Sequence, residues 1–223
     1  MSLLSLYYSR IVEHGLYFVS SLPVLDLLTI GMTCPQRPFY ERDTSVVARD
    51  LLGKKLVRLL TGNSGDQERL VGIITETEAY GGEDDPASHA FHGFTPRNSI
   101  MFERGGLSYV YFIYGMYHCM NVSARSRNKK AGGVLIRSIL PIEGINKMMI
   151  HRNSKNIGDL ANGPGKLTKS LLIDRSHNGL DLTDFACSLH IENGKTPTPR
   201  RILAAPRIGI SVGTELNWRF KLS

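Results

Sequence analysis

The sequence has few cysteines, and it lacks the cysteine and histidine spacings of zinc sites. Cys34, Cys119 and Cys187 lie far apart, and none belongs to a CxxC pair. An odd number of isolated cysteines argues against a disulfide framework, so we expect a reducing, intracellular compartment. The chain also lacks an apolar run of the roughly 18 residues that a membrane span needs. These absences argue against a disulfide-rich secreted protein and against a membrane protein.

Acidic residues are outnumbered by basic ones. The 223 residues include 27 Lys and Arg but 20 Asp and Glu, which gives a formal net charge of +7. The acids gather in residues 76–85, whereas residues 97–155 are strongly basic. A basic balance favours nucleic acid or another anionic surface as the partner, with a solvated basic face as the alternative. A hydrophobic content of 42% fits one globular domain with a proper core.

The start of the chain differs from the rest. Residues 16–28 are apolar but interrupted by a proline and an aspartate, and they lack the lysine-rich start and cleavage site of a signal peptide. We predict two parts: an N-terminal extension of uncertain role, residues 1–36, and one functional domain, residues 37–223. The extension either packs on the domain as an added helix or reflects an upstream extension of a gene whose usual start is Met32.

The predicted elements follow a mixed order rather than a strict alternation of strand and helix. Asp43 is placed to cap a helix that Gly53 ends, and Pro164 lies near the first turn of another helix. We therefore expect an α+β fold, a single mixed domain with a mainly antiparallel, curved sheet and surrounding helices. The predicted strands are residues 55–60, 70–78, 107–113, 118–123, 134–139, 208–212 and 218–222, and the predicted helices are 44–52, 143–152 and one opening at Asn162.

Two acids on a largely apolar strand are the leading candidates for chemistry. Glu76 and Glu78 are one strand period apart, so their side chains share a face, and burying them without a partner would be costly. The functional interpretation makes Glu78 a general base that activates water. Glycosidases use two carboxylates on an O-glycosidic bond, but an N-glycosidic bond to an electron-poor base needs less acid assistance. The structural alternative is an ion pair between Glu76 and a basic residue such as Arg137.

Aromatic residues follow the acids. Tyr80, His89 and Tyr111 are candidates for the walls of a slot that holds a flat ring, and core packing is the alternative for each. The strands before and after Tyr114 predict a protruding β-hairpin with this tyrosine near its tip. Such an aromatic suits a wedge that enters the minor groove and fills the gap left by an extruded base, unless the hairpin folds back onto the domain.

Two further motifs carry less weight. Residues 162–166, Asn-Gly-Pro-Gly-Lys, are similar to a phosphate cradle at a helix start but lack the spacing of a Walker A loop. Asp84, Asp85 and His89 offer metal-ligand atoms, yet no further histidines stand at ligand spacing, so we predict no metal site.

Many of these residues fall in motifs that resemble the alkyladenine (3-methyladenine) DNA glycosylase family. The resemblance runs in order from about Arg37 to the C-terminus and leaves residues 1–36 uncovered. The loop between His89 and Thr95 is one residue shorter than in vertebrate members. The matching strings are residues 76–80, 85–89, 95–98, 101–102, 109–111, 114–116, 120–122, 133–137, 163–167 and 207–210.

The resemblance implies a monofunctional DNA glycosylase of base excision repair. Such an enzyme flips an alkylated or deaminated purine (3-methyladenine, hypoxanthine or etheno-adenine type) out of double-stranded DNA and hydrolyses the N-glycosidic bond, leaving an abasic site. We expect no cofactor, no metal and no membrane partner. We also expect a monomer that works inside the cell with DNA, in the cytoplasm or nucleoid or in a eukaryotic nucleus. A lesion sensor that does not cut, and an enzyme acting on a small nucleoside or anionic metabolite, are the alternatives.

The resemblance also implies a role for each matching residue. Glu78 activates the water, and Arg137 positions that water or the sugar phosphate. Tyr80, His89 and Tyr111 line the base pocket. Asn121 lies on the pocket floor and disfavours a base that carries the exocyclic amine of guanine. Tyr114 is the intercalating wedge. The residues implied to bind DNA are Thr95, Arg97, Met116 and Lys166.

Overall fold

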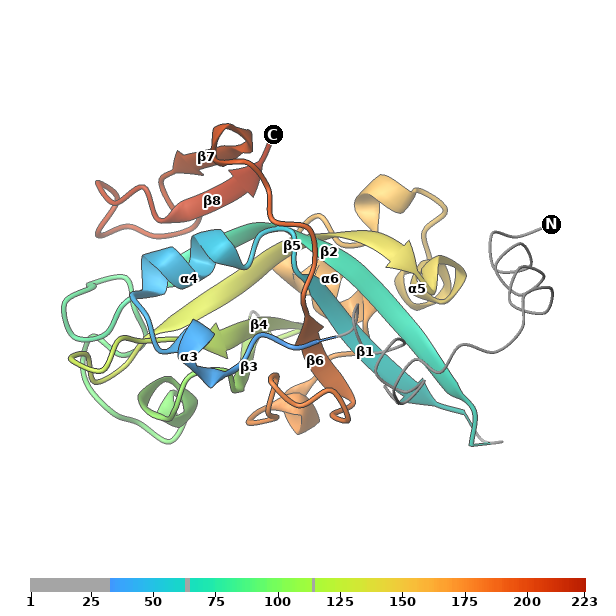
Figure 1. The fold of residues 1–223 in the computed structure, drawn as a ribbon, viewed down its shortest axis with the longest axis horizontal. Coiled ribbons are helices and arrows are strands. Elements are labelled where there is room, and N and C mark those ends of the chain that lie inside the picture. Colours follow the sequence, from blue (N-terminus) through green and yellow to red (C-terminus); the bar gives the residue numbers. More distant parts are fainter. Residues whose placement is uncertain (1–32, 63–64, 114) are drawn as a thin grey trace, which may run out of the picture. The chain divides into compact units, whose positions relative to one another are not determined.

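The computed structural model describes residues 33–62, 65–113 and 115–223 (Figure 1). This part of the chain has a mixed α+β architecture, as the sequence predicts, with one eight-stranded sheet. The strands are β1 Lys55–Thr61, β2 Gln67–Tyr80, β3 Ser108–Ile113, β4 Tyr117–Ser123, β5 Gly133–Glu143, β6 Leu189–Glu192, β7 Ile202–Ala205 and β8 Arg219–Leu222. The α-helices are α3 Arg37–Tyr40, α4 Thr44–Asp50, α5 Ile145–Arg152 and α6 Pro164–Ser170, and the 3₁₀ helices are Ser99–Phe102, Ile157–Asp159, Arg175–His177 and Pro199–Arg201.

The sheet is antiparallel at every pairing between these strands, with the order β3-β4-β5-β2-β1-β6. Strand β2 is the longest and lies beside β5 along most of its length (Figure 1). On its other edge β2 pairs first with β1 and then, from Glu76 to Glu78, with β8. The two acids therefore lie in the middle of three strands, where the backbone is held on both sides.

A change of register between β2 and β5 occurs next to these acids. Ile74 pairs with Ile139 and Glu76 with Ser138, so Thr75 is an extra residue in β2. Extra residues of this kind reset the alternation of side chains and bend the strand, and they are common next to active sites. The sequence pattern alone does not reveal this bulge.

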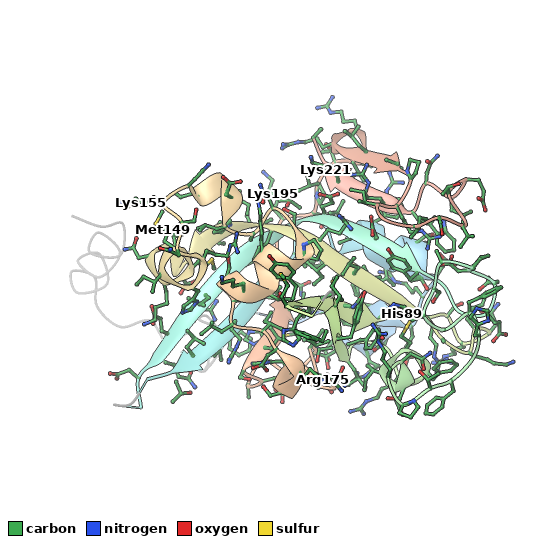
Figure 2. The ribbon with its side chains drawn as sticks, turned by 180° about the vertical axis from the view of Figure 1, so that it is seen from behind. His89, Met149, Lys155, Arg175, Lys195 and Lys221 are labelled. Carbon is green, nitrogen blue, oxygen red and sulfur yellow. The ribbon has the colours of Figure 1, made fainter. Side chains whose placement is uncertain are left out.

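Helices cover both faces of the central sheet. Asp43 caps α4 by accepting a hydrogen bond from the amide of Ser45, as the sequence predicts, and Gly53 follows with a positive φ of 82°. Helix α4 contacts β2 and β5, while α6 contacts β4 and β5, and the two helices lie on opposite sides of the sheet (Figure 1 and Figure 2). The core between these layers is apolar and includes Leu51 and Ile74, both fully buried.

The predicted strand at residues 208–212 is wrong. This segment is irregular, because glycines at 209 and 213 adopt positive φ values of 77° and 64° and the amide of Ile208 bonds to a side chain instead of a neighbouring strand. The strand at this end of the chain is β7, which pairs with β8. Strand β6, a short strand that pairs with β1, was also not predicted from the sequence.

The predicted hairpin is formed by β3 and β4, with Ile113 paired to Tyr117. Tyr114 itself lies outside the described residues, so its protrusion and its role as a wedge stay predictions. None of the helices among residues 33–62, 65–113 and 115–223 is long and apolar enough to cross a lipid bilayer.

Candidate active site

A cavity of about 620 Å³ opens between β2, β3, β4, β5 and two loops. The volume is in the range of small-ligand pockets, and aromatic side chains provide much of the wall. The first loop, residues 81–107, carries His89, which Figure 2 labels beside the sheet. The second loop is residues 206–218. Six residues predicted from the sequence line this one cavity: Tyr80, His89, Arg97, Tyr111, Asn121 and Arg137.

Glu78 lies directly behind the cavity wall and is fully buried. Its Oε2 accepts hydrogen bonds from the Tyr80 hydroxyl at 2.9 Å and from Nη1 of Arg137 at 3.1 Å. Its Oε1 accepts a third hydrogen bond from the backbone N–H of Ile208 at 2.7 Å. All three partners are donors, an arrangement that suits an ionised carboxylate. Two of these donors, Tyr80 and Arg137, also line the cavity.

Arg137 joins Glu76 and Glu78 of β2. Ile136 pairs with Thr77 and Ser138 with Glu76, so Arg137 is the residue of β5 left out of the register. Its Nε lies 3.6 Å from Oε1 of Glu76. The ion pair that the sequence offered as a structural alternative is therefore present, and the same guanidinium also bonds to Glu78. A second cation, Arg219 of β8, hydrogen-bonds to Glu76 at 3.0 Å.

A buried ion pair beside Tyr80 was not predicted from the sequence. Nη2 of Arg207 donates to Oδ1 of Asp85 at 2.8 Å, and both side chains are fully buried. The same guanidinium donates to the carbonyl of Ala79 at 3.0 Å and lies 4.9 Å from the centre of the Tyr80 ring. Because Arg207 directly precedes Ile208, this pair fixes both the tyrosine and the amide that contact Glu78.

A cluster of rings forms another part of the cavity wall. Nδ1 of His89 lies 3.0 Å from the hydroxyl of Tyr109, and the His89 ring contacts the Tyr111 ring edge-on with centroids 4.7 Å apart. Burial, together with the nearby Arg97 guanidinium, lowers the pKa of His89 below its ordinary value of 6.5. Tyr109 was missed as a site residue, although its two-residue spacing from Tyr111 places both rings on one face.

Asn98 holds the loop that carries His89. Its Nδ2 donates to the carbonyl of His89 at 2.8 Å and to that of Gly93 at 2.9 Å, and its Oδ1 accepts from the amide of Thr95 at 2.6 Å. Asn98 is almost fully buried, so these bonds are shielded from water. The loop is therefore fixed by one side chain at three points.

Asn121 of β4 lies at the cavity wall and is buried. Its Nδ2 donates to the backbone carbonyl of Tyr109 at 3.0 Å. This bond orients the amide group, and the role of Asn121 as a selective pocket floor stays a prediction.

The other predicted DNA-binding residues lie outside the cavity lining. Thr95 is exposed on the loop, and Met116 has 65% of its surface exposed just after β3. Nζ of Lys166 donates to Oδ1 of Asn162 at 2.8 Å, inside the segment predicted as a phosphate cradle. Their DNA contacts, and that of Tyr114, stay predictions.

The two aspartates considered as metal ligands, Asp84 and Asp85, bond to basic side chains instead. Asp85 is paired with Arg207, and Asp84 bonds to Nζ of Lys129 at 2.6 Å. Among the residues that the structure describes, no group of three histidine, cysteine, aspartate or glutamate side chains is arranged to hold a metal ion.

Comparison with known proteins identifies the family. The chain matches the family model described as methylpurine-DNA glycosylase over residues 38–223. It is 44% identical over 184 residues to the "Putative 3-methyladenine DNA glycosylase" of Chlorobium phaeovibrioides, covering 82% of this chain and 90% of that protein. Proteins with the same name from Carboxydothermus hydrogenoformans and Sodalis glossinidius are each 44% identical, covering 83% and 86% of this chain and 93% and 98% of the relatives. The chain therefore belongs to the methylpurine-DNA glycosylase family, whose members are hydrolases of N-glycosyl bonds in DNA.

Proposed function

We propose that this protein is a monofunctional DNA glycosylase of base excision repair that removes alkylated or deaminated purines from double-stranded DNA. The proposed lesions are of the 3-methyladenine, hypoxanthine and etheno-adenine types. The domain of residues 37–223 carries the activity, acts as a monomer and meets DNA inside the cell. A damaged or mispaired base costs less to extrude than a sound one, which contributes to lesion selection.

The observation that supports this proposal most is the place of Glu78. A buried carboxylate is hydrogen-bonded by Tyr80 and Arg137, two residues that line an aromatic cavity. A carboxylate accepts about four hydrogen bonds. Tyr80, Arg137 and Ile208 supply three of them. The proposed water is the fourth donor, and its proton passes to Glu78.

The proposed reaction is a displacement at C1′ of the extruded nucleotide. As Glu78 takes the proton, the water oxygen bonds to C1′ and the bond from C1′ to the base nitrogen breaks, with its electron pair leaving on the base. Positive charge develops on the sugar in this transition state, and the negative charge of Glu78 stabilises it. The products are a free base and an abasic site. Water is the nucleophile, so the enzyme is monofunctional.

We propose the following places for the other predicted residues around this reaction. Tyr80 on one side, with His89 and Tyr111 on the other, sandwiches the flipped ring, while Asn121 excludes a purine that carries the exocyclic amine of guanine. Tyr114 fills the gap in the duplex. Thr95, Arg97, Met116 and Lys166 contact the DNA around it.

Release of free base tests the proposal. Duplex oligonucleotides with a single 3-methyladenine-type, hypoxanthine or etheno-adenine lesion are incubated with the protein beside an undamaged duplex. The proposal predicts a free base and an alkali-labile site from at least one lesion and nothing from the control. Tight lesion binding without release would favour the lesion sensor, and release from free nucleosides without duplex binding would favour the metabolite enzyme.

A further inference from the structure

Some exposed phenylalanines belong to the segments that line the cavity. Among the described residues four phenylalanines are exposed, and three of them, Phe91, Phe94 and Phe112, belong to segments that border it. Phe112 is itself a lining residue, while Phe91 and Phe94 lie between the lining residues His89 and Arg97. Large apolar side chains that gather on a surface mark interaction sites more often than scattered ones do.

Phe94 is the most exposed of the three. It keeps 64% of its surface exposed, against 36% for Phe91 and 44% for Phe112. Its ring contacts Phe102 edge-on, with centroids 5.5 Å apart. The ring is thus supported from one side by a neighbour and leaves most of its surface for another partner.

The turn that presents Phe94 is rigid. Gly93, which precedes it, has a φ of 92°, and no other atom lies within 4 Å of the position where a Cβ would stand. Asn98 binds the carbonyls of His89 and Gly93 and the amide of Thr95, so both sides of Phe94 are tied to one buried side chain. A preorganised aromatic loses little conformational freedom on binding, which favours a recognition role over an incidental one.

An exposed arginine follows this turn. The guanidinium of Arg97 lies over the Tyr111 ring at 5.3 Å, and Arg97 is exposed. Aromatic side chains that accept bases, interleaved with arginines that meet phosphates, are typical of surfaces that bind nucleic acid strands.

We propose that residues 91–94 form a second DNA-contacting tip, in which Phe94 packs against a base of the duplex next to the extruded nucleotide. This inference rests on the proposed function and adds a partner surface to it. The occupant is duplex DNA, because the tip is continuous with the cavity through His89 and Arg97. The tip stabilises the distorted duplex around the lesion, while the cavity holds the flipped base.

The test compares Phe94→Ala with Phe185→Ala. Phe185 is the fourth exposed phenylalanine, with 41% of its surface exposed, and its ring contacts His190 of β6, at the far edge of the sheet from β3. Each variant and the wild type are titrated into a duplex that carries a stable abasic analogue, with 2-aminopurine as the neighbouring base. We expect Phe94→Ala to bind roughly 10-fold more weakly, as for the loss of one base–aromatic contact. Phe185→Ala should bind as the wild type does.

Two additional readouts separate the contact from other causes. Phe94→Trp keeps an aromatic face and should restore binding, and the change in 2-aminopurine fluorescence on binding should be lost in Phe94→Ala and kept in Phe94→Trp. The salt dependence of binding should be unchanged, because no charge is removed. Thermal unfolding should also be unchanged, since the ring is largely exposed.

The outcomes distinguish this inference from the proposed function. If the wild type excises a lesion but Phe94→Ala matches Phe185→Ala in affinity and fluorescence, the tip has no DNA contact and the inference is overturned while the function stands. If the wild type binds without excision and Phe94→Ala still binds about 10-fold more weakly, the inference holds and the proposed reaction fails. Altered self-association of Phe94→Ala at unchanged DNA affinity would assign the tip to a second copy of this chain and overturn the inference.

Discussion

Nη1 of Arg137 lies 3.1 Å from Oε2 of Glu78, across two neighbouring strands whose register shifts at this point. The shift leaves Arg137 without a partner residue in β2 and lets its guanidinium reach Glu76 as well, at 3.6 Å. A charge as buried as that of Glu78 requires such a counter-charge. The link between the two residues therefore serves stability as well as the proposed chemistry.

Replacing Arg137 should destabilise the fold. Arg137→Met keeps much of the volume but leaves Glu78 as a buried charge without its cation, so we expect a loss of about 3 kcal/mol in the free energy of unfolding. Urea denaturation of the purified variant measures it. The double variant Glu78→Gln with Arg137→Met should recover part of this loss, because no buried charge remains at Glu78. Equal stability of the single and double variants would contradict the pairing.

The buried pair of Asp85 and Arg207 should matter for both folding and excision. Asp85→Asn leaves Arg207 without its carboxylate in a fully buried place, so we expect a loss of about 3 kcal/mol in the free energy of unfolding. Excision by the fraction that remains folded should also fall, because Arg207 positions Tyr80 and Ile208. Asp84→Asn is the matched control, since the Asp84 pair with Lys129 is exposed to solvent. Similar stabilities for the two variants would count against this role.

Stability should fall on mild acidification because of His89. Its pKa is lowered in the folded protein by burial first and by Arg97 second, so the unfolded chain binds a proton more readily. The stabilising contribution is present above the ordinary value of 6.5 and is lost as the pH falls from there through the folded-state pKa. In His89→Gln the free energy of unfolding should depend less on pH in this range. His92→Gln, at an exposed neighbour, is measured beside it, and identical pH profiles for the wild type and His89→Gln would refute the assignment.

Asn121 should affect selectivity more than rate. Its amide is oriented by the carbonyl of Tyr109, so Asn121→Ala removes a group that the proposal uses to exclude guanine. We expect the rate of methylated-guanine excision to rise roughly 10-fold relative to that of hypoxanthine, which corresponds to about 1.4 kcal/mol in the barrier. Competition between the two lesions in one reaction measures the ratio. An unchanged ratio would remove this role from Asn121.

Much of the fold was predictable because its local signals agree. Asp43 and Gly53 mark the ends of α4, and alternating or apolar runs mark most of the strands. The prediction failed at residues 208–212, where an apolar, strand-like composition is overruled by the bond between Ile208 and Glu78. No local pattern reports a hydrogen bond to a residue 130 positions away.

The site was predictable where residues lie on one strand or in recognisable motifs. The spacing of Glu76, Glu78 and Tyr80 places them together on β2. Arg207 was present in a matching string, but nothing in the sequence links it to Asp85, since long-range pairing depends on how the two loops fold. The same limit applies to Asn98, whose three loop contacts become visible only in the structure.

Glu78 is the proposed general base, and Glu78→Gln is the decisive substitution. Single-turnover release of hypoxanthine, 3-methyladenine or etheno-adenine from duplex DNA is measured beside binding of the same duplexes. The account predicts that the variant stays folded, binds the lesion as the wild type does and excises it about 100-fold or more slowly. Excision at close to the wild-type rate would contradict the account.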